Sequence, residues 1–250
     1  MLMASALVSS LAEEKPKAAK KSPWVALDIT TGCNADVINT HTHIARDVFN
    51  APQQSGWATT KLLDQGGGVE QGIPDDGLIE IPGADPKGFL HALVGKEKNA
   101  LLITDPQGRL PNAIKIVLPK DQRAKYSKVT VLHASCFGDG EILATLHYDR
   151  GADGVLTLNV LNWLLENRNL QMLPDQMEAV KTQRVSRGSV LDVVARMTSQ
   201  TFEVDPKRAL QSITFARKSN TATTAQGEDA AGNFTVGIFA VSALPAAGRK

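Results

Sequence analysis

Short runs of alternating or β-branched residues recur between turn signals from Ile73 to Trp163, and they constrain the fold more than any other feature. The gaps are rich in Gly, Pro, Asp and Asn, and the spacing of about 8–15 residues is typical of an antiparallel sandwich or barrel. The runs are 77–81, 89–94, 100–104, 113–118, 128–133, 142–148 and 155–160. The sequence therefore predicts an all-β fold of antiparallel strands.

Residues on either side of this stretch extend the strand pattern. Trp24–Ile29 is expected to be an opening strand, and residues 201–204, 210–215 and 235–242 are expected to be closing strands. The last run is apolar on both alternating faces, which places it inside a sheet rather than at an edge. Residues 31–72 break the pattern with polar and Gly-rich sequence, so a long irregular excursion is expected there.

Two segments favour helix over strand. Pro174–Lys181 and Ser189–Met197 are predicted as short helices, and in the second Ser189 is placed to cap the N-terminus with Asp192 at the third helical position. One or two short helices would then be inserted in a single sandwich domain over residues 24–244, followed by a tail at 245–250.

The N-terminal sequence favours export. Residues 1–12 are an apolar run that ends in Ser10-Leu11-Ala12, a small-x-small triplet typical of a signal-peptide cleavage site. Residues 13–23 then form a charged, flexible leader. The protein is expected in the periplasm, at the cell surface or outside the cell; the alternative is a frayed apolar N-terminus. No stretch reaches the roughly 18 apolar residues of a membrane helix, so no membrane span is expected.

Charge and cysteine content limit the remaining possibilities. The chain has 27 basic and 26 acidic residues, which gives no electrostatic case for binding nucleic acid. Its two cysteines are Cys33 and Cys136. In an exported protein their pairing would close a loop of about a hundred residues and add roughly 4–5 kcal/mol by chain entropy. The alternative is two separate buried thiols, which pack as small hydrophobic side chains.

Several local motifs, taken in order, resemble a known family of sandwiches. They are Gly72–Gly77, Asn99–Ile103, Ile116–Pro119 with Tyr126, Leu146–Asp149, Leu158–Trp163, Val204–Lys207, Leu210–Thr214 and Ile238–Ser242. Over residues 70–163 and 200–242 the chain is similar to the galactose-binding-like β-sandwiches of exported bacterial proteins, which are often non-catalytic carbohydrate-binding modules. The segments 31–72 and 164–198 depart from this pattern. The resemblance implies a jelly-roll sandwich, sometimes with a structural calcium, and a ligand at loops on one edge or on the concave face.

Sugar binding needs an aromatic plane with hydrogen-bonding side chains around it. Trp57 is the first candidate because it stands in a polar, Gly-rich loop; the alternative is a loop anchor that closes one end of the core. Trp163 follows a predicted strand and would line an edge or pack in the core. Tyr148 and Asp149 complete the candidate ligand set, unless they only close a hairpin. The predicted partner is a polysaccharide or glycan, or a protein at the cell surface.

Two candidate metal sites remain open. The turn Asp75-Asp76-Gly77 has the oxygen ligands that calcium prefers, although adjacent Asp residues are also common turn formers. His41 and His43 would share one face of an extended segment, and with Asp47 and His91 they form a ligand set for iron, manganese or zinc. This set resembles the split metal-binding motifs of cupins, with Asp47 in place of the usual Glu.

Catalytic motifs do not point to an enzyme. The sequence has no Gly-x-Ser-x-Gly elbow, P-loop or dinucleotide fingerprint. Three hypotheses follow: a non-catalytic carbohydrate-binding or surface interaction module, a cupin-like metalloprotein or metalloenzyme, and a structural accessory domain without a ligand.

Overall fold

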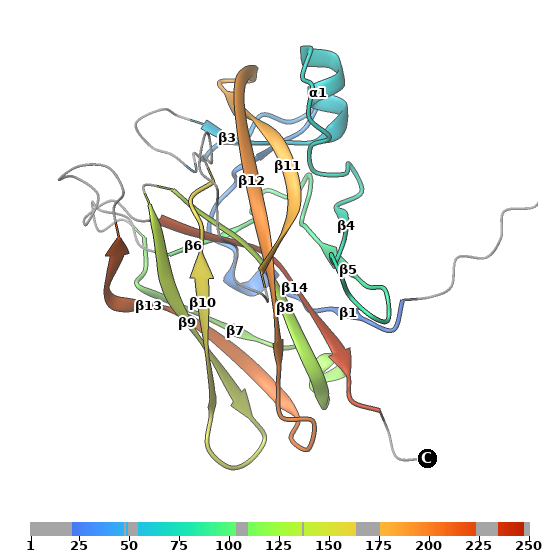
Figure 1. Ribbon diagram of the computed structural model, residues 1–250, viewed down its shortest axis with the longest axis vertical. Coiled ribbons are helices and arrows are strands. Elements are labelled where there is room, and N and C mark those ends of the chain that lie inside the picture. Colours follow the sequence, from blue (N-terminus) through green and yellow to red (C-terminus); the bar gives the residue numbers. More distant parts are fainter. Residues whose placement is uncertain are drawn as a thin grey trace, which may run out of the picture.

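The computed structural model describes residues 22–47, 49, 55–103, 110–136, 138–163, 176–223 and 235–247. The described chain is mostly β-strand, with a single α-helix within those ranges, and its strands form curled, largely antiparallel sheets (Figure 1). The all-β prediction is therefore confirmed.

The larger sheet has eight strands. Along the main path they are β1 (Val25–Ala26), β14 (Thr235–Pro245), β8 (Tyr126–Cys136), β12 (Ser189–Glu203), β11 (Gln176–Ser186), β3 (Ser55–Ala58) and β2 (Ile38–Asn39), while β6 (Leu101–Ile103) also pairs with β14. Neighbours are antiparallel apart from β2 and β3, which run parallel.

A second sheet of four strands faces the first. Its order is β10 (Gly154–Val160), β9 (Asp139–Tyr148), β13 (Leu210–Thr223) and β7 (Ala113–Val117). A separate hairpin is made of β4 (Leu78–Glu80) and β5 (Phe89–His91). The helical elements are α1 (Thr60–Gly66) and two single 3-10 turns, η1 (Thr30–Gly32) and η2 (Lys120–Gln122).

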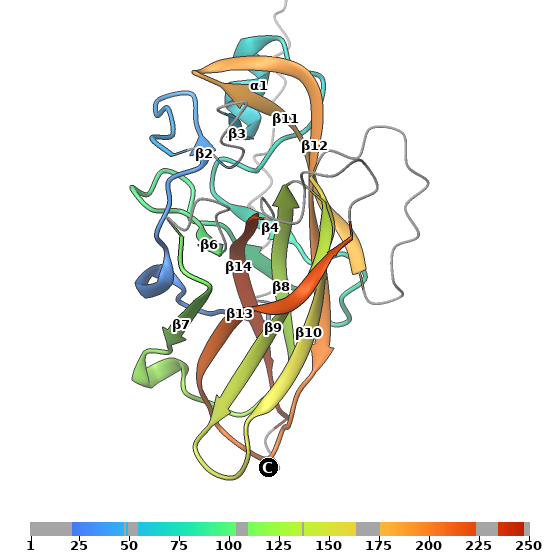
Figure 2. The same cartoon turned by 90° about the vertical axis from the view of Figure 1, so that its left-hand side faces the viewer.

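The larger sheet is covered on both faces, which explains its apolar sequence. One face packs on the smaller sheet, where residues such as Val131 and Ile238 meet Leu158 and Phe215. The opposite face packs on the β4–β5 hairpin through a second cluster, in which Leu132 and Phe239 of the larger sheet lie with Ile79 and Leu90 of the hairpin. Trp57 of β3 belongs to the same cluster. Figure 1 shows the resulting layers, with β9, β10 and β13 on one side of β8, β12 and β14 and the β4–β5 hairpin on the other. In Figure 2 the smaller sheet faces the viewer, and β9, β10 and β13 lie in front of β8 and β14.

The strand predictions agree well with this architecture. Each of the seven runs between residues 77 and 160 overlaps one strand, β4 to β10 in chain order. The C-terminal run forms β14, which lies between β1 and β8 and is buried over Thr235–Ala243. Its position inside the sheet was expected from apolar residues on both faces.

The two predicted helices are wrong. Residues 174–181 and 189–197 fall largely in β11 and β12, which form a long antiparallel hairpin. The hairpin turns at Arg187 and Gly188, whose φ angles of 50° and 82° fit the two-residue turn that matches strand twist. The β-branched residues of 189–198 pair with β11 and, from Thr198 onward, with β8. These long-range ladders outweigh a local capping pattern.

The excursion at 31–72 is more ordered than expected. It supplies β2, β3 and α1, and α1 ends at Gly67 in the left-handed region with φ 74°. The Gly-rich stretch 66–68 is therefore a helix C-terminus, where glycine is favoured because a side chain would be strained.

Candidate functional site

Trp57 and Trp163 lie in the core and not at a ligand surface. Both are fully buried, with ring centroids 4.9 Å apart, and Phe49 and Phe239 pack against them. Neither indole has a face on which a sugar could stack. The prediction that Trp57 and Trp163 bind a ligand is therefore wrong. The alternatives, a loop anchor for Trp57 and core packing for Trp163, describe what is observed.

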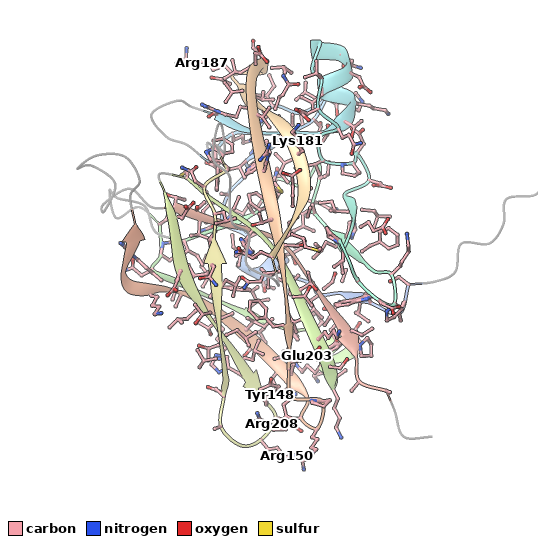
Figure 3. The ribbon with its side chains drawn as sticks, viewed as in Figure 1. Tyr148, Arg150, Lys181, Arg187, Glu203 and Arg208 are labelled. Atoms are coloured by element: carbon pink, nitrogen blue, oxygen red, sulfur yellow. The ribbon has the colours of Figure 1, made fainter. Side chains whose placement is uncertain are left out.

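Tyr148 lies beside Arg208 at one end of the smaller sheet (Figure 3), and Asp149 follows it directly after β9. The Arg208 guanidinium carbon lies 4.0 Å from the centroid of the Tyr148 ring, and a Cβ at Gly154 would come within 3.2 Å of Tyr148 Cε2. Asp149 Oδ1 accepts a hydrogen bond from the Ala209 amide at 3.1 Å. The ring therefore packs within the protein and offers little open surface to a ligand.

Arg208 also joins neighbouring loops to each other. Its Nε donates to Asp205 at 2.8 Å, and its Nη1 donates to the carbonyls of Arg150 and Ala152. Hydrogen bonds from the Lys207 amide and the Arg208 side chain lower the pKa of Asp205. Arg208 thus connects the β9–β10 loop to the β12–β13 loop, which is a structural role.

The acidic turn before β4 uses its carboxylates locally. Asp76 Oδ1 accepts a hydrogen bond from the Leu78 amide at 2.9 Å, and Gly77 has φ 74°. Asp75 Oδ2 accepts from the Lys61 amide at 3.1 Å, in the first turn of α1. Turn formation and satisfaction of a free helical N–H account for both side chains.

The four proposed transition-metal ligands do not come together. Within the described ranges, no three His, Cys, Asp or Glu side chains are grouped so that they could hold a metal ion. His43 pairs with Asp36, His41 Nδ1 lies 3.9 Å from Asp75 Oδ1, and His91 lies on β5. The cupin-like ligand set is therefore wrong in this structure.

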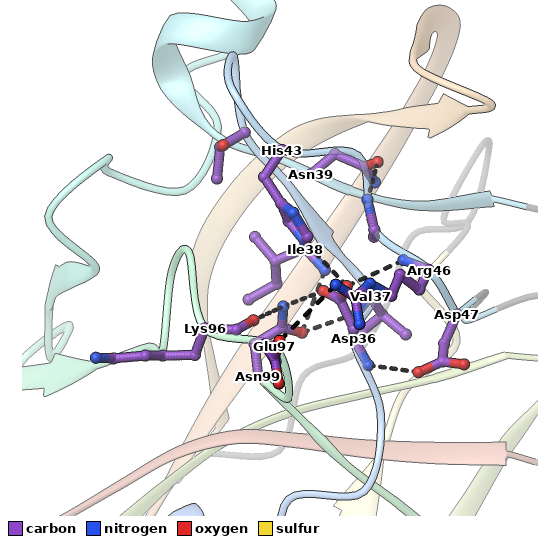
Figure 4. A network of polar contacts seen from close by, with 12 residues as sticks. Asp36, Val37, Ile38, Asn39, His43, Arg46, Asp47, Lys96, Glu97 and Asn99 are labelled. Carbon is purple, nitrogen blue, oxygen red and sulfur yellow. Dashed lines mark hydrogen bonds and ion pairs between the residues drawn. The ribbon is translucent and has the colours of Figure 1, made fainter.

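His43 instead belongs to a polar network around Asp36 (Figure 4). Asp36 is only 1% exposed, and its Oδ1 accepts from Asn99 Nδ2 at 2.7 Å. Its Oδ2 faces His43 Nε2 at 2.9 Å and accepts from the Arg46 amide at 3.0 Å. Because a carboxylate can only accept, His43 Nε2 must carry the proton.

Further contacts tie this network to the backbone. Asn99 Oδ1 accepts from the Val37 and Ile38 amides, at 2.8 and 3.2 Å. Asp47 Oδ2 accepts from the Asp36 amide at 2.8 Å, and the Asp47 amide donates to the Asp36 carbonyl at 2.9 Å. The network fixes the 36–47 segment against the loop before β6, which is a structural role for Asp36, Asp47 and His43.

The cysteines are two separate thiols, which is the alternative to the disulfide hypothesis. Cys33 packs in the cluster between the sheets and Cys136 in the cluster on the opposite face of the larger sheet. Burial raises the pKa of each thiol to about 12. Both are therefore poor nucleophiles, which agrees with a packing role.

The outward side of the β4–β5 hairpin carries a different group of residues. Ile79 and Leu90 point inward and are buried, whereas Leu78, Glu80, Phe89 and His91 are exposed. Leu78 stands opposite His91, and Glu80 stands opposite Phe89. We call these four exposed residues the hairpin face.

Phe89 gives this face an aromatic platform. It is 40% exposed, and no other aromatic side chain in the described part of the chain is classed as exposed. Lys87 Nζ donates to Glu80 Oε1 at 2.9 Å, which places charged hydrogen-bonding groups on the strand opposite Phe89. The alternation of inward and outward residues was visible in the sequence, but Phe89 was not singled out because its run was assigned to the scaffold.

Two shallow grooves lie beside the hairpin and share Pro82 as a wall. The first has a volume of about 310 Å³ and lies over β12, lined by Trp24, Met177, Ser199, Thr201, Glu203 and others. The second, of about 370 Å³, lies between β4 and β11, lined by Leu78, Glu80, Ala179, Lys181 and others. Both volumes fall at the lower end of the range for small-ligand sites. Glu80 links the second groove to the hairpin face, since it lines the one and belongs to the other.

Comparison with known proteins adds no assignment. No protein-family model matches the sequence, and no curated protein matches it. A search of the helices in the described ranges found none of the length and apolarity needed to cross a membrane.

Proposed function

We propose that this chain is a non-catalytic carbohydrate-binding module of an exported protein, with its ligand on the hairpin face. The observation that carries the proposal is Phe89, an exposed ring on a strand whose partner supplies Glu80 and whose own next outward residue is His91. An aromatic plane beside hydrogen-bonding side chains is what recognition of a sugar requires.

The sequence motifs give independent support. Over residues 70–163 and 200–242 they resemble galactose-binding-like sandwiches, for which a jelly-roll topology and carbohydrate binding are the expectation. The apolar run at 1–12 supports export, and it lies outside the described residues. On this proposal the ligand site differs from the one expected from sequence, because the two candidate tryptophans are buried.

Binding to immobilised glycans and affinity electrophoresis in polysaccharide gels test the proposal. Phe89→Ala should weaken binding about tenfold or more, as expected for an aromatic residue at the centre of a contact. Val155→Ala is the matched control: Val155 is 61% exposed on β10, in the smaller sheet, and should bind as the unmodified protein does.

Thermal unfolding of both variants checks that the fold is intact, which is expected because both side chains are exposed. Equal binding by Phe89→Ala and the unmodified protein would exclude the hairpin face. A complete absence of binding across plant, algal and bacterial polysaccharides would reject carbohydrate binding and favour a structural accessory domain.

A further inference from the structure

The grooves beside the hairpin extend the hairpin face into a longer surface. Ser199, Thr201 and Glu203 alternate along β12 on the face that lines the first groove, a distance of about 13 Å from the first to the third at strand spacing. Beyond Pro82 the second groove continues along β4 and β11 as far as Lys181. Lys181, on β11, and Glu203, at the end of β12, lie far apart in Figure 3. A single sugar ring fills only part of such a surface.

The charges on this surface are compensated. The two lysines that line the grooves each form an ion pair, Lys128 with Glu203 at 3.2 Å and Lys181 with Glu70 at 2.8 Å. Glu80 of the hairpin face pairs with Lys87 at 2.9 Å. Asp85 also lines the first groove, so the two linings together hold three carboxylates, Glu80, Asp85 and Glu203, and two lysines. A sulfated or uronic-acid glycan would therefore meet more negative than positive charge, which disfavours its binding.

The walls suit an uncharged ligand with both apolar and hydroxyl surfaces. Met177 and Leu78 are 43% and 47% exposed and provide apolar contacts in the first and second groove. The first groove is also lined by the hydroxyl side chains of Ser199, which is 3% exposed, and Thr201, whose Oγ1 lies 2.8 Å from Thr130 Oγ1. A hydroxyl group can both donate and accept hydrogen bonds. This mixture matches the C–H faces and hydroxyl edges of a neutral sugar chain.

From these observations we infer that the ligand is a neutral, linear polysaccharide that runs along both grooves past Pro82, with several sugar units in contact. This inference rests on the proposed carbohydrate-binding function and adds two properties to it: the absence of charge on the ligand and a requirement for chain length.

Matched glycans test the absence of charge. Dextran is compared with dextran sulfate, xylan with glucuronoxylan, and agarose with carrageenan, at 20 and 300 mM NaCl. A neutral member should bind, its affinity should change less than twofold with salt, and its acidic counterpart should bind at least fivefold more weakly at low salt. Stronger binding of an acidic glycan that is lost at high salt would overturn this part, while binding itself would still support the proposed function.

Oligosaccharides of two to eight units, cut from the glycan that binds, test the length requirement. Affinity should rise at least tenfold from the disaccharide to the octasaccharide. Met177→Ala and Leu78→Ala should each lower octasaccharide affinity about fivefold, as for moderate contact residues; Val117→Ala, exposed on β7 in the smaller sheet, is the control. Equal affinities for all lengths would overturn the inference but leave the proposed function standing, whereas no binding of any glycan would reject both.

Discussion

His133 makes the stability of this fold sensitive to acid. The side chain is fully buried in β8, and desolvation lowers its pKa to about 3 from a usual value near 6.5. Nδ1 lies 3.3 Å from Thr198 Oγ1, while Nε2 is buried and has no hydrogen-bond partner among the residues that the structure describes. The folded protein therefore holds this histidine in its neutral form.

The sign of the pH dependence follows from this depressed pKa. The unfolded chain takes up a proton at His133 below about pH 6.5, and the folded chain does not until about pH 3. Stability from this residue is complete above pH 6.5 and falls as the pH drops through that window. The slope is at most about 1.4 kcal/mol per pH unit, which gives a loss of about 2 kcal/mol at pH 5.

His133→Leu removes the titrating group while keeping an apolar side chain of similar length. The Thr198 hydroxyl retains its hydrogen bond to the His133 backbone carbonyl at 3.4 Å, so the variant should be about as stable as the unmodified protein at pH 7.5. At pH 5 it should be more stable by about 2 kcal/mol. Urea denaturation followed by tryptophan fluorescence at pH 7.5, 6 and 5 measures both values.

The control is His91→Gln, because the His91 ring is exposed and meets water in both states. It should lose stability in acid as steeply as the unmodified protein. If His133→Leu shows the same acid loss as His91→Gln, His133 is not the group that titrates and the reasoning from its burial is refuted.

Two further predictions concern the polar network and the cysteines. Asp36→Ala should lower the free energy of unfolding by about 3–5 kcal/mol, because a buried carboxylate with three hydrogen-bond donors is lost, whereas Asp47→Ala should cost about 1 kcal/mol. Urea denaturation compares them, and equal losses would contradict a central role for Asp36. Cys33 and Cys136 should both resist a thiol reagent at pH 8 in the native protein and both react after unfolding without reductant. Absence of reactive thiol after unfolding would show that they are paired.

The strands could be predicted because their evidence is local. In β14 apolar residues occupy both alternating faces, and the structure covers both faces of that strand. The β4–β5 hairpin likewise shows the alternation of a half-buried ladder, with Ile79 and Leu90 inward. In these elements the alternation of apolar residues agrees with the burial that the folded protein provides. The two-residue period of the sequence can predict a strand correctly only where the two agree.

The β11–β12 hairpin could not be predicted from the same evidence. Ser189 and Asp192 match the pattern of a helix N-terminus. Two other features favour a strand: the two-residue turn at Arg187-Gly188, and pairing to β8, which is more than fifty residues away in sequence. An Arg with positive φ is uncommon, so the dipeptide gives a weak signal of this turn. The strand forms because long-range hydrogen bonds and burial outweigh the local preference.

The candidate site lies on the β4–β5 hairpin, so it depends on which of the hairpin's side chains point away from the larger sheet. Trp57 looked exposed because its neighbours in sequence are polar and small, yet β11 and β2 pair with β3 on its two sides and the ring is buried in the cluster with Trp163 and Phe239. Phe89 opens a run that the sequence predicts only as a strand, and in that strand Leu90 turns inward while Phe89 and His91 point outward. Successive side chains of a strand point to opposite faces, so a difference of one position in the sequence moves a side chain from the core to the surface. The proposed binding surface depends on which alternate residues of β4 and β5 point outward and on where the hairpin lies on the larger sheet. The hydrophobicity of neighbouring residues in sequence indicates neither.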